Sequence, residues 1–250
     1  MIENIENRSI IINVTNENIK LPKNIKEDID KFWERIEKED NNLFNGEIMT
    51  VCSFENIEDN IIINCKKTNY AHYLYDERIG LPNEYSCHSL AAGCLLETSD
   101  NYYIIGELAT GMSIQHCLQI SGGAADNRDI KNGNINILDI IEREVKEELN
   151  IDLKDNKNLD GYKIKYMSFP NEKANTYIFF GKGKLKKNKE EIKRNYEKYL
   201  QKLINNNGEI EFQKLHFINK ENAIQQLQNL KRPKREYLTE LLKVDSNNIE

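Results

Sequence analysis

From Cys87 onward, strand-like apolar runs alternate with segments of helical periodicity, and this order limits the possible folds. The strand-like runs are CHSLAAGCLLET, YYIIGEL, HCLQISGGAAD, GYKIKYMSF, NTYIFFGKGKL and EIEFQKLHFI. Helices are predicted at 136–149, at 189–206 and on both sides of Pro233. We therefore expect a mixed α/β (α+β) fold in which helices sandwich a mixed sheet. The first two runs are expected to pair as a hairpin.

The first 86 residues have the pattern of a smaller α+β unit. Residues 24–40 place apolar side chains at helical spacing. EIMTVCSF and NIIINCKK predict a β-hairpin, and a helix capped by Thr68 or Asn69 is expected to follow. The expected division is an N-terminal module at 1–86, a larger domain at 87–243 and a frayed tail at 244–250.

Charge and composition restrict the partners of this chain. The net charge is -6, with 30% charged and 39% hydrophobic residues. These values are typical of a soluble globular protein and argue against general binding to nucleic acid or to an anionic membrane. No signal-peptide pattern and no membrane-spanning apolar run is found, and five widely spaced cysteines predict reduced thiols in a cytoplasmic protein. The oligomeric state is left open.

Three glutamates gather near the end of the predicted helix at 136–149, namely Glu144, Glu147 and Glu148. At about 100° per residue they span an arc of roughly 100°, so they share one face beside an apolar stripe. Each like-charge pair at this spacing costs roughly 0.2 to 0.5 kcal/mol. A hard cation such as Mg²⁺ reverses this repulsion because it binds carboxylate oxygens. The alternative is an ordinary solvated helix end.

The residues around these glutamates favour the cation site. Residues 143–151, Arg-Glu-Val-Lys-Glu-Glu-Leu-Asn-Ile, resemble the Nudix signature Arg-Glu-apolar-X-Glu-Glu-X-Gly-apolar. The Gly122-Gly123 pair, which ends the preceding strand, resembles the glycine start of that signature. The resemblance implies a Nudix-type fold whose glutamates bind Mg²⁺ or Mn²⁺, and an enzyme that splits a nucleoside diphosphate linked to another moiety.

The signature differs from the family pattern in three places. Asn150 replaces the final glycine, and asparagine also tolerates a left-handed backbone at a helix end. The loop between Gly123 and Arg143 is longer than in the family, and Ile135 stands where the family has a glutamate. This loop is therefore expected to lack its acidic anchor. The long loop, the asparagine and the N-terminal module are similar to the Nudix branch that cleaves UDP-glucose and UDP-galactose into UMP and a sugar 1-phosphate.

The resemblance implies roles for individual acidic residues. Glu144, Glu147 and Glu148 would bind the metal ion, which acidifies a water nucleophile. Glu144 and Glu148 are also catalytic candidates, together with Glu172 in the turn PNEKA, because a carboxylate must accept the proton of that water. The alternative for Glu172 is a solvated turn residue. Arg143 is expected to orient the cluster by pairing with a carboxylate.

Four residues are assigned to substrate binding. Gly122 and Gly123 take this role from the signature, since they form its glycine start. Tyr70 belongs to an aromatic run that can stack on a nucleobase, and Arg78 can meet a phosphate. The alternative for Tyr70 is packing at the junction between the two units.

The resemblance implies a Mg²⁺-dependent diphosphatase (pyrophosphohydrolase) that acts on a small nucleotide, with a UDP-sugar as the preferred substrate. A second hypothesis keeps the reaction and changes the substrate to ADP-ribose, a dinucleotide or a nucleoside triphosphate. A third is a Nudix-shaped module that binds a nucleotide without cleaving it. The missing upstream glutamate favours the third hypothesis, whereas the three carboxylates argue against it.

Overall fold

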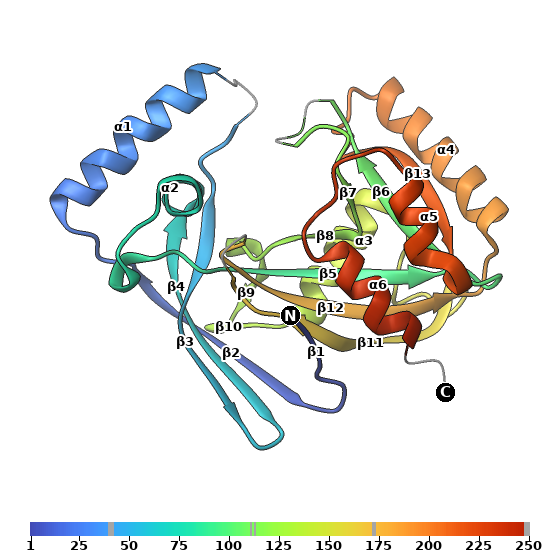
Figure 1. Cartoon of the computed structure of the whole chain (residues 1–250), viewed down its shortest axis with the longest axis horizontal. Helices are drawn as coiled ribbons and strands as arrows, with labels where there is room; N and C mark the ends of the chain where they lie inside the picture. Colours follow the sequence, from blue (N-terminus) through green and yellow to red (C-terminus); the bar gives the residue numbers. More distant parts are fainter. Residues whose placement is uncertain (40–42, 111, 113, 172–173, 248–250) are drawn as a thin grey trace.

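The computed structural model describes residues 1–39, 43–110, 112, 114–171 and 174–247. The helices are α1 (Lys23–Glu39), α2 (Tyr70–Ile79), α3 (Ile137–Leu149), α4 (Lys189–Asn205), α5 (Ala223–Asn229) and α6 (Leu238–Asn247). The strands are β1 (Ile2–Asn4), β2 (Ser9–Asn18), β3 (Glu47–Ile57), β4 (Asn60–Asn69), β5 (Ser89–Glu97), β6 (Tyr102–Leu108), β7 (Leu118–Gln119), β8 (Ser121–Ala124), β9 (Ile130–Lys131), β10 (Asn134–Ile135), β11 (Leu159–Ser168), β12 (Thr176–Leu185) and β13 (Phe212–Asn219). Figure 1 shows their arrangement.

Strands from both ends of the sequence belong to one mixed sheet. The main order is β1-β11-β12-β5-β3-β4-β2-β10-β9; in addition β8 and β6 pair with β5, and β7 and β13 pair with β6. The pairs β5–β12 and β2–β4 are parallel, whereas the hairpins β3–β4 and β11–β12 are antiparallel. This sheet, with helices on both faces, confirms the predicted mixed α/β class.

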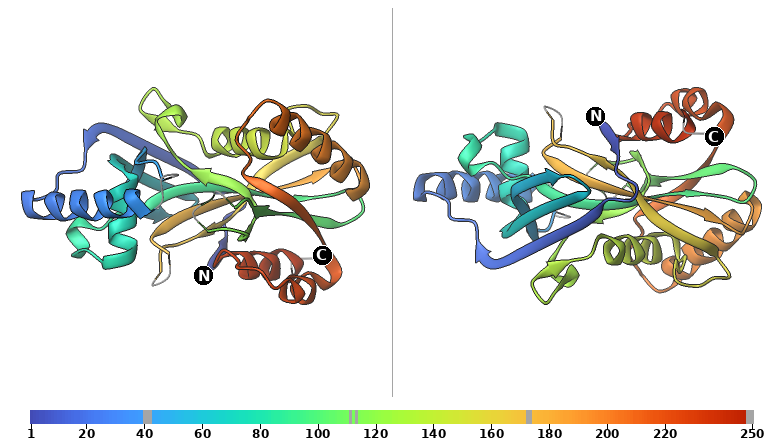
Figure 2. Two further views of the ribbon diagram at one scale, coloured as in Figure 1. Left: turned by 90° about the horizontal axis from the view of Figure 1, so that it is seen from above. Right: turned by 90° about the horizontal axis from the view of Figure 1, so that it is seen from below.

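Helices cover both faces of the sheet. In Figure 2, α3 and α4 lie on one face and α5 and α6 on the other, while α1 and α2 lie at the far end. The α3 side holds the largest apolar cluster, and α5 and α6 cover a second one. Within the described residues, no helix is both long and apolar enough to span a membrane.

Helices α1 and α2 and the β3–β4 hairpin follow the sequence prediction, whereas strands β1 and β2 were not predicted. The helix expected at 24–40 is α1, whose buried stripe of Ile29, Phe32, Trp33 and Ile36 packs against α2. Asn69 caps α2 as predicted, because its side-chain oxygen accepts a hydrogen bond from the His72 backbone amide at 2.9 Å. Local signals were sufficient here, since apolar spacing defines α1 and a cap residue marks the start of α2.

The predicted hairpin between 87–98 and 102–108 is wrong over most of its length. The strands β5 and β6 pair only at Glu97 and Tyr103. Instead, β5 runs parallel to β12 along its whole length and pairs with β8 on its other side. A strand that is buried on both faces reads as a continuous apolar run, and such a run does not reveal which partner it pairs with.

The tail expected to be frayed from residue 244 is also corrected. α6 continues through Asn247, and Asp245 is buried. Its carboxylate accepts hydrogen bonds from the hydroxyls of Tyr103 at 2.6 Å and Tyr166 at 2.9 Å, and from Lys182 Nζ at 2.8 Å. These three donors hold the polar end of α6 on the sheet. Residues 248–250 lie outside the described part.

Candidate active site

Helix α3 brings the signature glutamates to the sheet. Asn136 caps its start by accepting a hydrogen bond from the Leu138 amide at 3.1 Å, and Asn150 ends it in the left-handed conformation with φ 54°. Asparagine tolerates this backbone conformation, as expected where it stands in place of the last glycine of the Nudix signature. The apolar stripe of α3 is buried against the sheet and holds the helix in place; it consists of Ile137, Ile140, Ile141, Val145 and Leu149.

All three predicted metal ligands line one cavity beside α3. Its volume is about 380 Å³, and we call it the carboxylate cavity. Its walls comprise Gly122, Gly123, Ala124, Arg128, Arg143, Glu144, Glu147, Glu148, Tyr196, Leu203, Glu209 and Glu211. Glu144 and Glu148 are only 8% and 5% exposed, whereas Glu147 is exposed. The three side chains share a cavity, therefore, but only two of them are buried in its wall.

The glycine pair on β8 allows α3 to approach the sheet. The amide of Gly122 donates a hydrogen bond to Glu148 Oε2 at 3.0 Å. A Cβ atom on Gly123 would lie 2.3 Å from Glu144 Oε1, and a Cβ atom on Gly122 would lie 2.4 Å from the Ala92 carbonyl oxygen. Gly123 thus leaves room for the Glu144 carboxylate of α3, whereas Gly122 leaves room for the backbone of the neighbouring strand β5.

Arg143 is fixed by an acid from the long loop. Its Nε and Nη2 donate to the two carboxylate oxygens of Asp129 at 3.1 and 3.0 Å, and Asp129 is only 3% exposed. Its Nη1 donates to Glu144 at 2.7 Å and to Glu147 at 3.4 Å. The expected orienting role of Arg143 agrees with this geometry. The expectation that the loop lacks an acidic anchor is wrong, because Asp129 provides one.

The buried acids of this cavity have raised pKa values. Burial raises the pKa of Glu144 to about 7, although Arg143 opposes the shift. Burial also raises the pKa of Glu148 well above its ordinary value, and the neighbouring Glu211 carboxyl raises it further. The pKa of Glu211 is itself raised by burial. Three acids thus face one cavity with too few cations to balance them.

The carboxylate and hydroxyl oxygens that face this cavity are of the kind that binds a hard divalent cation. Glu148 Oε1 and Ser121 Oγ are buried without a hydrogen-bond partner among the described residues. An unsatisfied carboxylate oxygen among other acids is the kind of ligand that Mg²⁺ and Mn²⁺ bind. Within the described part of the chain, no three His, Cys, Asp or Glu side chains already stand in a group that could hold an ion. Binding would therefore require side chains such as Glu147, which pairs with Arg143, to turn inward.

A second cavity of about 430 Å³ adjoins the first, and we call it the tyrosine cavity. It lies between α2 and the strands β5, β8 and β12, and Tyr70, Tyr73 and Tyr237 are among the residues that line it. Arg78 also lines it and is exposed. Both substrate-binding candidates from α2 thus face a cavity.

The two cavities share part of their lining. Gly122, Gly123, Ala124 and Glu211 line both of them. The predicted glycine pair consequently lies where a ligand that extends from one cavity to the other would pass.

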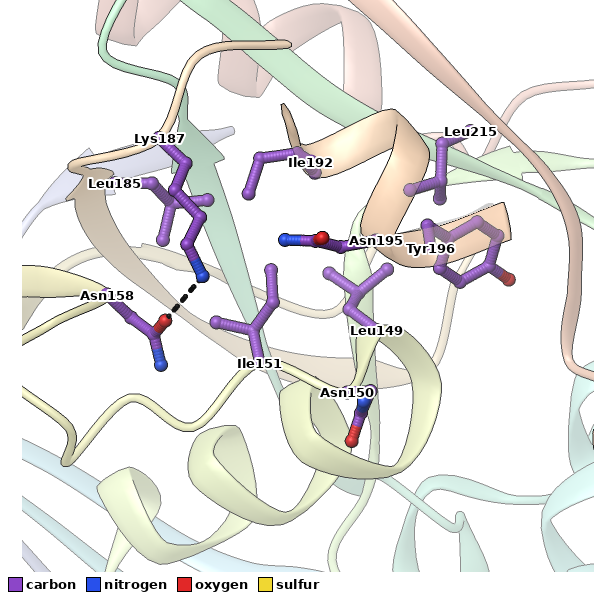
Figure 3. A pocket seen from close by; sticks show the side chains of 10 residues that line it. All are labelled: Leu149, Asn150, Ile151, Asn158, Leu185, Lys187, Ile192, Asn195, Tyr196 and Leu215. Carbon is purple, nitrogen blue, oxygen red and sulfur yellow. Dashed lines mark hydrogen bonds between the residues drawn. The ribbon is translucent and has the colours of Figure 1, made fainter. Parts of the chain in front are cut away.

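A separate cavity of only about 40 Å³ lies between the end of α3 and the start of α4 (Figure 3). Most of its lining is apolar, and its Lys187 is bound to Asn158 at 3.2 Å. A space of this size has room for a water molecule or two. We regard it as a packing defect behind the site.

Three acids of the site, Asp129, Glu209 and Glu211, were not singled out from the sequence. Asp129 lies in a polar loop, and Glu211 lies directly before β13 within a run read as a strand. An acid next to an apolar strand was the only available signal for Glu211. The catalytic candidate Glu172 lies outside the described residues.

The comparisons with known proteins gave matches only among solved structures. No family model and no curated protein matches the sequence. The chain is similar to DR0079 from Deinococcus radiodurans (12% identity, TM-score 0.43, covering 62% of this chain and 82% of that one). It is also similar to a NUDIX hydrolase from Nitrosomonas europaea (14%, 0.38, 64% and 88%). A bifunctional NMN adenylyltransferase/ADP ribose pyrophosphatase from Francisella tularensis, complexed with AMP and a Mn ion, gives 13%, 0.42, 70% and 44%. At these identities and TM-scores, the similarity does not by itself establish a family.

Proposed function

We propose that this protein is a divalent-metal-dependent hydrolase that cleaves the diphosphate of a nucleoside diphosphate-linked molecule. A UDP-sugar, cleaved to UMP and a sugar 1-phosphate, is the first substrate to test. The observation that carries the proposal is the group of buried acids Glu144, Glu148 and Glu211, which face a cavity with raised pKa values and a carboxylate oxygen without a partner. Such a group is stable only if a cation or protons neutralise it.

The chemistry follows from the position of each group. Glu144, Glu147 and Glu148 would hold Mg²⁺ or Mn²⁺, which when bound neutralises charge on the diphosphate and acidifies a water molecule. Arg143 orients Glu144 and is itself held by Asp129. It does not act as a base, because its pKa is raised above an already high value: burial opposes the shift, but Asp129 and Glu144 outweigh burial.

The proton of the water must pass to a carboxylate. Glu144 and Glu148 are candidates from the signature, and Glu172 is the candidate from a later loop. Glu211 joins them because it lies on the wall shared by both cavities and has a raised pKa, caused first by burial. A carboxylate with a pKa near the working pH is well suited to general base catalysis.

The cell compartment is part of the proposal as well. All five cysteines are free, and four of them are buried. Free thiols of this kind are typical of reducing compartments. We therefore place the reaction in the cytoplasm.

The test is the release of nucleoside monophosphate with Mg²⁺ or Mn²⁺, measured over a panel of UDP-sugars, ADP-ribose, dinucleotides and nucleoside triphosphates. Glu148→Gln is expected to lower turnover at least about 100-fold, since it removes a charged metal ligand. Glu211→Gln and Glu172→Gln separate the two additional base candidates. Glu197→Gln, an exposed glutamate on α4, is the matched control and should leave turnover unchanged.

The alternative functions give different results in this assay. Preference for ADP-ribose, a dinucleotide or a triphosphate changes the substrate and keeps the reaction. Binding of nucleotides without metal-dependent turnover would identify a nucleotide-binding module instead. Full activity of Glu148→Gln would overturn the assignment of the metal ligands.

A further inference from the structure

The two cavities together suit a linear substrate. Gly122, Gly123, Ala124 and Glu211 line both cavities, so the tyrosine cavity lies directly beside the acids. The tyrosine cavity, at about 430 Å³, falls within the range of small-molecule pockets, which is roughly 300 to 1,000 Å³. A diphosphate at the acids can therefore extend its nucleoside into the tyrosine cavity.

The arginines of the carboxylate cavity are already occupied. Arg143 binds Asp129, Glu144 and Glu147. Arg128 binds Asp126 at 2.7 Å and lies 3.8 Å from Glu147. Neither guanidinium is free to bind a phosphate without giving up a carboxylate.

Arg235 differs because most of its guanidinium is unused. It lines the tyrosine cavity and is half-buried. Its Nε donates to Gln119 Oε1 at 3.0 Å. Within the described residues, no hydrogen bond or ion pair engages its two Nη atoms. Its backbone is held firmly, since the Arg235 amide donates to the Leu118 carbonyl at 3.0 Å and the adjacent Lys234 forms a bridge to Leu118 on β7.

The contacts of Arg235 place it at the junction of the cavities. Gln119, which accepts its Nε–H, donates in turn to Glu211 Oε1 at 3.5 Å. Burial raises the pKa of Tyr70, and Arg235 and Arg78 oppose that shift, so both cations lie within electrostatic reach of the Tyr70 ring. Arg235 therefore lies between Glu211 and Tyr70.

The aromatic wall is held rigidly. Tyr70 stacks on Tyr73 with ring centroids 6.0 Å apart and contacts Trp33 edge-on at 6.2 Å. The Tyr73 hydroxyl donates to Glu77 at 2.7 Å and lies 3.3 Å from Thr176 Oγ1 on β12. A fixed aromatic ring stacks on a nucleobase with little loss of conformational entropy.

We propose that Arg235 binds a phosphate oxygen of the substrate at the junction of the two cavities, with the adjoining nucleoside against Tyr70. The guanidinium fork matches two phosphate oxygens, and its place beside the acids fixes the direction in which the substrate lies. This assignment rests on the proposed function, which puts the diphosphate at the acids. Arg235 acts as a positioning residue for the scissile bond.

The test uses the fluorescence of Trp33, the single tryptophan of the chain, which contacts Tyr70. Binding of UMP and uridine, and of AMP and adenosine, is titrated at one fixed Mg²⁺ concentration. Arg235→Gln is expected to weaken monophosphate binding roughly 10- to 100-fold, as for the loss of a charged hydrogen bond, and to leave nucleoside binding nearly unchanged. In turnover, KM should rise more than kcat falls.

Three further variants exclude a purely structural effect. Arg235→Lys keeps the charge without the fork and should restore part of the affinity. Lys231→Gln removes a positive charge from an exposed position on the same segment and should change the affinity for neither ligand. Tyr70→Leu should weaken the binding of monophosphate and nucleoside equally, while Tyr70→Phe should still bind both.

The outcomes separate this inference from the proposed function. One outcome is that the wild-type protein cleaves no diphosphate while Arg235→Gln still binds monophosphates no better than nucleosides. That result would overturn the proposed reaction and support the phosphate site. If cleavage occurs and Arg235→Gln keeps the wild-type KM and monophosphate affinity, the reaction stands and the inference is overturned.

Discussion

Two groups of buried acids lie on opposite faces of the sheet, and they are neutralised differently. On the face covered by α5 and α6, Glu97 and Asp245 share Lys182, whose Nζ lies 3.0 and 2.8 Å from their oxygens. Lys220 adds a second cation to Glu97 at 3.0 Å. Burial alone would raise the pKa of both acids, but the cations, first of all Lys182, outweigh it and lower both values.

On the α3 face, burial and neighbouring acids outweigh the cations, so the pKa values of Glu144 and Glu148 are raised. Arg143 is shared among Asp129, Glu144 and Glu147. Burial and mutual repulsion raise the pKa of Glu148, and no ion pair reaches that carboxylate within the described residues. A group of acids that serves stability carries its own cations, as Glu97 and Asp245 do. The α3 group depends on protons or on a cation from solution, and this difference distinguishes a candidate site from a structural cluster.

The largest expected effect comes from removing the shared lysine. Lys182→Met leaves Glu97 and Asp245 buried beside each other without their main cation. Breaking a buried ion pair in this way costs about 3 to 5 kcal/mol. We expect the free energy of unfolding, measured with urea, to fall by this amount. The midpoint of thermal unfolding should fall by roughly 10 °C.

Lys184→Met is the control for this loss. Lys184 also pairs with Glu97, at 3.2 Å, but its side chain is 54% exposed. Exposed pairs contribute at most about 1 kcal/mol. Equal destabilisation by the two variants would contradict the view that the buried lysine holds this cluster together.

The second test compares the pH dependence of the two groups in the metal-free protein. The folded-state pKa of Glu144 is about 7, mainly because of burial, and lies above the ordinary value of 4.5. The folded state therefore keeps a proton that the unfolded state has released, so this part of the stability is present below pH 4.5 and is lost as the pH rises toward 7. The loss is on the order of 1 to 3 kcal/mol.

Urea unfolding with a chelator at several pH values measures this effect. Glu144→Gln cannot ionise, so it should gain stability relative to wild type as the pH rises. Asp245 has a lowered pKa, because Lys182 outweighs its burial, and the sign is reversed. Its contribution is present above its ordinary pKa of 3.8 and is lost as the pH falls, and Asp245→Asn removes it. Parallel pH profiles for the two variants would remove the distinction between the groups.

The smallest expected effect concerns the anchor of Arg143. Asp129→Asn keeps the shape of the side chain but removes the charge that fixes the guanidinium. Because a residue that orients a ligand acts indirectly, we expect turnover to fall roughly 10-fold with no change of fold. Asp28→Asn, an exposed position on α1, is the matched control. Full turnover of Asp129→Asn would show that Arg143 needs no anchor.

The local parts of the site could be predicted from the sequence. The helix α3 and its end at Asn150 follow from apolar spacing and from the residue types at its ends. The signature glutamates of α3 lie within a short segment, so their shared cavity also follows from helical geometry. The exposure of Glu147 did not follow, because it depends on the pairs that Arg143 and Arg128 form with it.

The parts that depend on distant contacts could not be predicted. Strand β5 finds its parallel partner β12 more than eighty residues later, and an apolar run gives no information on that choice. Asp129, Glu211 and Arg235 are single charged residues in loops or at strand starts. Only the folded chain shows that Asp129 pairs with Arg143 and that Glu211 and Arg235 line one cavity, and no periodicity marks them beforehand.

The first strand of the chain, β1, covers the free edge of strand β11. β1 pairs with β11, and the Ile2 amide donates to Glu240 on α6 at 3.0 Å. Without β1, the outer amide and carbonyl groups of β11 would be open to pairing with another molecule, which is a common route to aggregation. A fragment that starts at residue 87 inherits this open edge, so shortened versions intended for expression should retain the opening residues.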